Sequence, residues 1–173
     1  MARVFIGVGS NISPEQNVRR ALRLLARDVR VIGVSTVYRT AALDRPEQPD
    51  FLNCVVEVET DIAPVELKHS VLRRVEGQLG RIRGDDKYAP RTIDLDVLVY
   101  DGLTVEADDL MIPDPDIERR PFLAVPLCEL APELVLPNSG RRVCDAADAF
   151  ADHDMQALLE YTEIIRKDIE HGR

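Results

Sequence analysis

FLNCVVEVE, residues 51–59, is the stretch that decides the fold, because its side chains alternate between apolar and polar over most of its length. The apolar positions fall on one face of an extended chain and the polar positions on the other: Leu52, Cys54, Val56 and Val58 against Asn53, Glu57 and Glu59. Successive side chains of a β-strand point to opposite faces of a sheet. The pattern therefore predicts a strand of an antiparallel sheet, and we expect that strand to be half exposed.

A strand, a helix and a second strand are predicted before this stretch. Residues 3–8 are rich in β-formers and end at the turn cluster Gly9-Ser10-Asn11. Ser13 suits a helix N-cap and Pro14 the first helical position. Apolar residues then recur with the helical period: Val18, Ala21, Leu22, Leu25 and Val29. Residues 29–39 are typical of a strand.

A second helix and a fourth strand are predicted after it. Pro64 opens the helix and Gly80 ends it. One face of the helix is apolar: Leu67, Val71, Leu72, Val75 and Leu79. Residues 93–100 predict the strand, and Asp101-Gly102 favours a hairpin turn into a short β-like run at 103–106. The order βαββαβ predicts an α+β, ferredoxin-like fold, in which two helices cover one face of an antiparallel sheet.

The remainder of the chain predicts a helical extension of the same domain. Prolines after residue 106 divide the chain into short helices and loops, and from Arg141 the sequence favours helix. Four apolar residues of this tail share one helical stripe, which must pack on the body or on another subunit: Leu158, Tyr161, Ile165 and Ile169. We expect one main domain at residues 1–140, with the helical extension 141–173 packed on it. The chain is expected to be a monomer or a homodimer.

Composition limits the partners and the compartment. A net charge of −9 and a pI near 4.8 argue against nucleic acid as a partner. The start of the chain has no basic stretch followed by an apolar run, and no window approaches the roughly 18 apolar residues of a membrane-spanning helix, so we expect a cytoplasmic protein without a membrane partner. Cys54, Cys128 and Cys144 lack the close spacing of redox or metal motifs and are expected to be reduced, mostly buried thiols.

Asp94 and Asp96 are the first candidates for chemistry. They stand two residues apart on a predicted strand, so their side chains leave the same face with Cα atoms roughly 7 Å apart. Such a pair can hold Mg²⁺, which combines a few carboxylate oxygens with water and substrate phosphates. The alternative is an ordinary solvated face of an antiparallel strand.

A basic cluster lies between the second helix and this strand: Arg73, Arg74, Arg81, Arg83, Lys87 and Arg91. Guanidinium groups match phosphate oxygens, so cations beside two carboxylates indicate a metal–polyphosphate site. For Arg73 and Arg74 a solvated helix end is the alternative, because cations complement the helix dipole there.

Together with these residues, several ordered segments resemble 6-hydroxymethyl-7,8-dihydropterin pyrophosphokinases of folate biosynthesis. The resemblance runs from about Val4 to Pro137. Its landmarks are Gly9-Ser10-Asn11, Ser35 with Tyr38-Arg39-Thr40, Gln48-Pro49-Asp50-Phe51-Leu52-Asn53, Glu76 with Gly80-Arg81-Ile82-Arg83, Pro90-Arg91-Thr92-Ile93-Asp94-Leu95-Asp96, and Arg120-Pro121-Phe122 before Pro126-Leu127.

The resemblance implies a reaction and a nucleotide site. ATP and two Mg²⁺ ions would be used to transfer the β,γ-pyrophosphoryl group to the pterin's hydroxymethyl oxygen, with release of AMP. Asp94 and Asp96 would hold the metal and, with Arg81 and Arg91, would be the catalytic residues. The implied ATP-binding residues are Glu76, Arg81, Arg83, Tyr88, Arg91, Val97, Asp114 and Arg120.

The resemblance also implies a pterin site. Phe51 and Phe122 would stack on the two faces of the ring, and the amide of Asn53 would donate to and accept from its polar edge. Backbone contacts would come from the loop that contains Thr40, Ala42 and Leu43. Without the resemblance, plain core packing is the better interpretation of Phe51 and Phe122.

Four positions depart from the family pattern. Ala42 stands where proline is usual and Asp44 where glycine is usual, so the pterin loop is expected to be less preset in shape. Asp114 replaces a common histidine, and Tyr88 replaces a larger aromatic residue. Two alternatives therefore stay open: a non-catalytic pterin-binding module of the same fold, and an enzyme making the same transfer to a different small alcohol.

Overall fold

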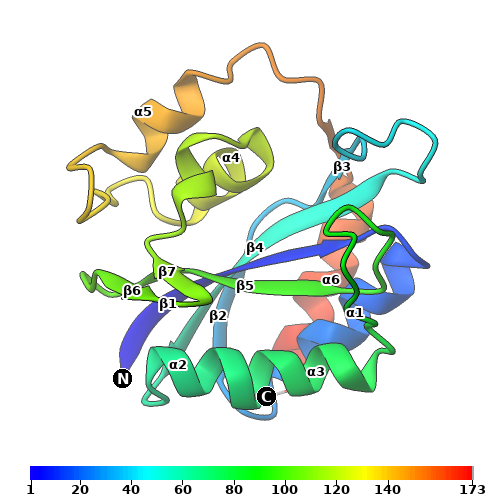
Figure 1. Ribbon diagram of the computed structural model, residues 1–173, viewed down its shortest axis with the longest axis horizontal. Coiled ribbons are helices and arrows are strands. Elements are labelled where there is room, and N and C mark those ends of the chain that lie inside the picture. The colour runs from blue at the N-terminus through cyan, green and yellow to red at the C-terminus, as the bar shows by residue number, and fades with distance from the viewer. Residues whose placement is uncertain (173) are drawn as a thin grey trace.

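An antiparallel sheet forms the centre of the computed structural model, which describes residues 1–172 (Figure 1). β1 (Ala2–Ser10) lies between β4 (Phe51–Thr60) and β5 (Asp94–Tyr100) and pairs antiparallel with both. β3 (Tyr38–Thr40) continues the sheet beyond β4, and β8 (Gln156–Ala157) follows β3. β2 (Arg30–Val34) also pairs with β4. The predicted α+β ferredoxin-like fold is confirmed.

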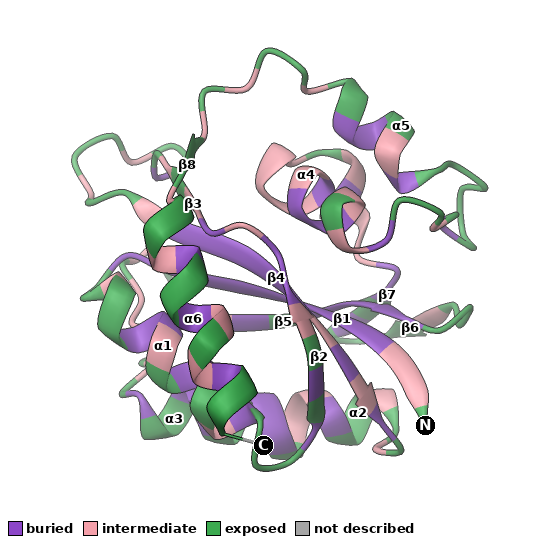
Figure 2. Ribbon diagram, turned by 180° about the vertical axis from the view of Figure 1, so that it is seen from behind, coloured by how far each residue is buried: buried purple, intermediate pink, exposed green. Residues whose placement is uncertain are grey.

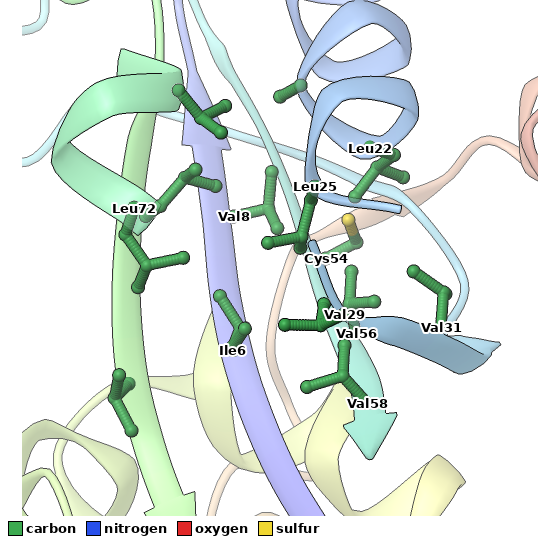
Figure 3. Close-up of a cluster of buried hydrophobic side chains, with 14 of the residues drawn as sticks. Ile6, Val8, Leu22, Leu25, Val29, Val31, Cys54, Val56, Val58 and Leu72 are labelled. Atoms are coloured by element: carbon green, nitrogen blue, oxygen red, sulfur yellow. The ribbon is translucent and has the colours of Figure 1, made fainter. Parts of the chain in front are cut away.

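One face of the sheet is covered by helices along its length (Figure 1). These are α1 (Pro14–Leu25), a helix running through α2 (Pro64–Glu66), the π-helical η1 (Leu67–Leu72) and α3 (Arg73–Gln78), and α6 (Leu159–His171). Their apolar stripes pack on the alternate side chains of the strands, as Figure 3 shows for Leu22, Leu25 and Leu72 over Ile6, Val8 and Val56. Burial of this apolar surface is the main stabilising contribution to the domain.

The other face is covered only in part, by α4 (Pro121–Leu130) and α5 (Val143–Asp148) (Figures 1 and 2). A second core forms there between α4 and the strands and includes Phe5, Val55, Leu98 and Leu127. The expectation of a half-exposed strand at 51–59 is therefore wrong. Val55 is fully buried because α4 packs over it.

The segment after β5 differs from the expected hairpin. Residues 103–106 do not pair back onto β5; β6 (Val105–Ala107) instead pairs with β7 (Leu110–Ile112) in a separate two-stranded sheet. The turn at Asp101 is present, with a left-handed φ of 45°. A 3₁₀-helix, η2 (Pro115–Glu118), then leads to α4.

Two local expectations before β4 are corrected. Residues 29–39 form β2 and β3 instead of one strand, because Ser35 leaves the regular ladder: its N–H donates to the Val55 carbonyl at 3.0 Å and its Oγ accepts from the Val55 N–H at 2.9 Å. Ser13 occupies the N-cap position of α1 with a left-handed φ of 42°, but its side chain forms no capping hydrogen bond.

The tail packs on the body of the protein. Ile165 and Ile169 of α6 are buried in the main core, and Leu158 and Tyr161 pack against that core. The tail also contributes the strand β8, which the helical expectation missed. Within residues 1–172, none of the helices is both long enough and apolar enough to cross a membrane.

The expectation of three reduced cysteines is wrong for two of them. Cys128 of α4 and Cys144 of α5 form a disulfide, with their Cα atoms 5.0 Å apart. Their separation of 16 residues matches no short motif, and only the packing of α5 on α4 brings them together. Cys54 is buried and free, as expected.

Candidate active site

A pocket of about 360 Å³ opens at the end of the sheet face that α4 leaves uncovered. Its floor comes from three neighbouring strands, with Gly9 of β1, Asn53 of β4 and Asp96 of β5. Its walls come from the loop after β3, the residues before β5, η2 and the start of α4. Twelve of the predicted site residues line it: Thr40, Ala42, Leu43, Phe51, Asn53, Tyr88, Arg91, Asp94, Asp96, Asp114, Arg120 and Phe122.

Asp94 and Asp96 point into this pocket from alternate positions of β5. Asp94 is half-buried, and Asp96 is exposed to the pocket. Desolvation by the concave walls, followed by the charges of Asp94 and Asp114, raises the pKa of Asp96 to about 8. A divalent cation would offset this repulsion, so the donor set fits Mg²⁺. Residues 1–172 contain no group of three or more acidic, histidine or cysteine side chains that could hold a metal ion.

Arg91 is held at the mouth of the pocket by both its backbone and its side chain. Its Nη1 donates to Asp94 Oδ2 at 2.7 Å, and its backbone N–H donates to Asn11 Oδ1 at 2.8 Å. Its guanidinium carbon lies 5.9 Å from the centroid of the Phe51 ring. The guanidinium therefore lies between the acidic pair and an aromatic side chain.

Glu76 lies beneath β5 and lines no pocket that we describe. It is only 2% exposed, and its Oε1 accepts from the Leu95 N–H, between the two aspartates, at 2.9 Å. Its Oε2 accepts from Arg83 Nη2 at 2.5 Å. The carboxylate thus ties the backbone of the Asp94–Asp96 segment to the arginine loop.

Arg81 and Arg83 also lie outside the pocket lining, on the loop after α3. Arg81 Nε is buried and has no hydrogen-bond partner within residues 1–172. Burial lowers the pKa of Arg81, while the charge of Asp94 acts in the opposite direction. A buried guanidinium nitrogen without an acceptor is costly, which favours an anionic ligand at this position.

The basic cluster expected from the sequence divides into two groups. Arg73 pairs with Asp109 at 2.5 Å and Arg74 pairs with Asp28, so both lie on the surface away from the pocket. Both side chains are solvated, as the alternative expected, but they lie within the helix that runs from Pro64 to Gln78 and not in its last turn. Lys87 lines the pocket, and its Nζ lies 4.9 Å from the Tyr88 ring centroid.

The predicted pterin residues are brought together at the other side of the pocket. Asn53 is 9% exposed, and its Nδ2 donates to Thr40 Oγ1 at 2.7 Å. Gly9 leaves room for this amide, because a Cβ there would lie 2.8 Å from Asn53 Oδ1. Phe51 and Phe122 are half-buried and both line the pocket. Neither ring is part of the closed core, so plain core packing does not account for them.

The loop that carries Ala42 and Leu43 contains two of the departures from the family pattern, Ala42 and Asp44. Ala42 is buried and Leu43 is exposed. Asp44 has φ 56°, the left-handed region in which glycine is unstrained and aspartate is tolerated. The position where the family usually has glycine therefore keeps a glycine-like backbone in this chain.

A second pocket of about 250 Å³ adjoins the first, because Asp96 and Asp114 line both. Val97 lines only this second pocket. Asp114 is the N-cap of η2, where its side chain accepts from the Asp116 N–H at 2.8 Å. Burial raises the pKa of Asp114. Arg120, which lines the first pocket, occupies the residue directly before α4.

Sequence reasoning missed several residues of these pockets. Gln48 lines the first pocket, donates to the Tyr88 carbonyl at 2.8 Å and accepts from Asn11 Nδ2 at 3.2 Å. Gln48 and Asn11 both lie in segments that carry the family resemblance, and this was the only indication in the sequence that they belong to the site. Lys68 and Asp116 also line pockets, but no pattern in the sequence singles them out.

Comparisons with known proteins identify the family. Residues 5–132 match the sequence model described as 7,8-dihydro-6-hydroxymethylpterin-pyrophosphokinase (HPPK). The chain is 35% identical over 161 residues to the 2-amino-4-hydroxy-6-hydroxymethyldihydropteridine pyrophosphokinase of Haemophilus influenzae, covering 91% of this chain and 99% of that one. It is 39% identical over 141 residues to the enzyme of the same name from Synechocystis, covering 80% of this chain and 71% of that one.

A crystal structure of wild-type Plasmodium falciparum HPPK-DHPS with SDX-DHP has the same fold, with a TM-score of 0.68. The superposition covers 88% of this chain and 44% of that one, so this chain spans less than half of that protein. At 13% identity this likeness concerns the fold alone. The sequence comparisons carry the assignment: the chain belongs to the 7,8-dihydro-6-hydroxymethylpterin-pyrophosphokinase family.

Proposed function

We propose that this chain transfers the β,γ-pyrophosphoryl group of ATP to the hydroxymethyl oxygen of 6-hydroxymethyl-7,8-dihydropterin and releases AMP. Membership of the family makes it an ATP-dependent pyrophosphokinase of folate biosynthesis. The proposal concerns the residues that carry out the transfer and the number of metal ions. The observation that supports it most is the placement of Asp94, Asp96 and Arg91 opposite Asn53, Phe51 and Phe122 in one pocket.

Asp94 and Asp96 would hold two Mg²⁺ ions, which supply charge neutralisation for the transferred phosphoryl groups when bound. Arg91 is positioned to bind phosphate oxygens, because Asp94 and Asn11 fix it at the pocket mouth. The unpaired Nε of Arg81 makes this residue the second candidate for a phosphate ligand. Arg83 and Glu76 would support these groups from below β5, instead of contacting the pterin.

The nucleotide would lie across the junction of the two pockets. Tyr88 and Arg120 line the first pocket, Val97 lines the second, and Asp114 lines both. The protein has little covalent chemistry to perform in a phosphoryl transfer, so its contribution is alignment and charge stabilisation. A pocket that held both substrates over β1, β4 and β5 would provide that alignment.

The pterin would lie between Phe51 and Phe122 with its polar edge toward Asn53. The Asn53 amide is oriented by Thr40, so its remaining donor and acceptor capacity is directed before a ligand arrives. Thr40, Ala42 and Leu43 close this side of the pocket. We further propose that residues 141–173 are an extension of the same domain, and that the chain acts in the cytoplasm as a monomer or homodimer without nucleic acid or membrane partners.

The test is a product assay. Purified protein with ATP, Mg²⁺ and 6-hydroxymethyl-7,8-dihydropterin is expected to form AMP and the pterin pyrophosphate in equal amounts, measured by ³¹P NMR and chromatography. ADP in place of AMP would overturn the pyrophosphoryl transfer. Pterin binding without any nucleotide turnover would identify a non-catalytic binding module, and turnover with another hydroxymethyl compound but not with the pterin would identify a different acceptor.

A further inference from the structure

The short strand β3 leads directly into the pterin side of the pocket, and part of its support comes from the tail of the chain. Tyr38 and Arg39 pair with Asn53 and Leu52 of β4 on one side. On the other side they pair with Ala157 and Gln156 of β8. β3 is three residues long and ends at Thr40, which orients Asn53. Its position therefore depends on both of its neighbours.

The residue before β3, Val37, takes both of its backbone hydrogen bonds from the tail. Its N–H donates to Thr162 Oγ1 at 2.9 Å, and its carbonyl accepts from the Leu158 N–H at 2.9 Å. Thr162 is 1% exposed, and its hydroxyl also donates to the Leu158 carbonyl at 2.8 Å. Loss of the hydroxyl would leave the Val37 N–H buried without its acceptor.

A second contact of α6 acts on the same segment. Arg166 Nε donates to the carbonyl of Val34, the last residue of β2, at 3.0 Å. Residues 34–37 are thus bound by α6 at both ends. All of these tail residues lie beyond residues 5–132, the part that matches the family model.

We propose that Thr162 is a positioning residue for pterin binding: it holds Val37, and through β3 it sets the place of Thr40 and Asn53. This inference rests on the proposed function, because it assumes that the pterin binds beside Asn53. Thr162 does not line the pocket. Its effect should therefore fall on the affinity for one substrate, the pterin, and leave the nucleotide side on β5 unchanged.

The chain offers a series of matched variants. Thr162→Val keeps the shape of the side chain and removes the hydroxyl, and Thr162→Ser keeps the hydroxyl. Arg166→Met removes the second contact at a half-buried position. Asp168→Asn is the control on the same helix, because Asp168 contacts Arg19 and Arg23 of α1 and not the β2–β3 segment.

Steady-state kinetics and calorimetry on the full chain test the proposal. Thr162→Val is expected to raise the KM and the Kd for the pterin about 5- to 10-fold, with the KM for MgATP changed less than twofold. Arg166→Met should shift in the same direction by a smaller factor. Thr162→Ser should restore values close to wild type, and Asp168→Asn should leave pterin affinity unchanged even if its Tm falls. Faster hydrogen exchange at Val37 and Tyr38 in Thr162→Val would show that the released segment is the cause.

Three outcomes would overturn the proposal: unchanged pterin affinity in Thr162→Val, equal losses for both substrates, or the same pterin loss in Asp168→Asn. The last two would mean general destabilisation. Failure of the proposed function is distinguishable, because it would appear as absence of AMP formation in the wild type. Pterin calorimetry and hydrogen exchange would still report on Thr162 in that case.

Discussion

The two faces of the sheet are closed in different ways, and β5 shows the contrast within four residues. Leu95 and Val97 lie on the face that η1 and α3 cover and are buried in the main core. Asp94 and Asp96 face the side that α4 and α5 cover only in part, and they line the pocket. A face closed along its length contributes stability, whereas a face left open at one end can keep charged groups that no core would tolerate. Because side chains alternate along β5, residues that stabilise the fold lie on one face of the strand and the candidate catalytic residues lie on the other.

The largest expected effect is the difference between substitutions on the two faces of β5. Asp94→Ala and Asp96→Ala should each lower turnover by about three orders of magnitude or more, because the metal would lose a ligand. The Tm of Asp96→Ala should stay the same or rise, since a carboxylate disfavoured by desolvation and by the neighbouring charges is removed. The Tm of Asp94→Ala should stay close to that of wild type, because the loss of its ion pair with Arg91 offsets the relief of repulsion. Leu95→Ala on the closed face should instead cost about 2–5 kcal/mol of stability. AMP formation at saturating Mg²⁺ measures the turnover, and thermal melts measure the stability. Turnover above about a tenth of the wild-type value in either aspartate variant would refute the two-metal site.

The disulfide links α4 and α5, the two helices on the partly covered face of the sheet. Replacing both Cys128 and Cys144 by alanine should lower the free energy of unfolding by up to about 3 kcal/mol, the chain-entropy value for a loop of this length. Activity of the folded protein should persist, because neither cysteine lines the pocket. Urea titrations with and without reductant measure the effect. Reductant should not change the free energy of unfolding of the double variant. If reductant also leaves that of the wild type unchanged, the disulfide does not stabilise the fold.

Substitution of Asn53 tests whether the pterin and MgATP bind at different sides of the pocket. Asn53→Ala should weaken pterin binding by about 1–3 kcal/mol, because the polar edge of the ligand loses its partner. MgATP binding should be unchanged. Gly9→Ala should act in the same direction, since the added Cβ would displace the Asn53 amide. Calorimetric titration measures the affinity for each ligand. Equal losses of affinity for the pterin and for MgATP would show that Asn53 is not part of the pterin site.

Asp114 combines a structural role with a charge beside the nucleotide site. Asp114→Asn should keep the cap on η2, remove the negative charge and tighten MgATP binding several-fold. Asp114→Ala should also remove the cap and cost about 1 kcal/mol of stability. Nucleotide titrations and thermal melts on the pair separate the two roles. Unchanged MgATP affinity in the asparagine variant would mean that the carboxylate does not face the nucleotide.

The smallest effect is a pH dependence of stability without metal. The folded state raises the pKa of Asp96 from 3.8 to about 8, so the protonated form is favoured by folding, and its contribution is lost progressively as the pH rises from about 4 to about 8. The Tm of Asp96→Asn should therefore exceed that of wild type by an amount that grows from pH 5 to about pH 8 in EDTA and then levels off. The difference should be modest, because Asp96 is exposed to the pocket. Mg²⁺ should reduce it, and a difference that is constant across this range would contradict the raised pKa.

Much of the closed face could be predicted from the sequence, because its pattern is local. The helical periods of residues 18–29 and 67–79 and the apolar alternation of β4 each depend on near neighbours, and they gave the order of helices and strands up to β5 except for the division of residues 29–39 into β2 and β3. The same locality placed Asp94 and Asp96 on one face of a strand. The cap at Asp114 was also predictable, since an Asx side chain followed by proline is a local helix start.

The open face was predicted less well, because its contacts join residues far apart in the chain. The burial of Val55, the Cys128–Cys144 bond and the strand β8 all result from packing of the last third of the chain on the sheet. Arg73 and Arg81 look alike in the sequence, yet Arg73 pairs with Asp109 on the surface, whereas the Nε of Arg81 is buried without an acceptor within residues 1–172.

By itself the sequence determined the order of elements, the acidic pair on β5 and the family, since each of these depends on residue types at short spacing or on segments in fixed order. Only the tertiary structure decided which charges meet in the pocket, that Glu76 lies beneath the aspartates, and that Thr162 holds the strand leading to Thr40. The physical reason is that a hydrogen bond or an ion pair depends on distances of about 3 Å between chain segments, and those distances exist only after the helices have packed on the sheet.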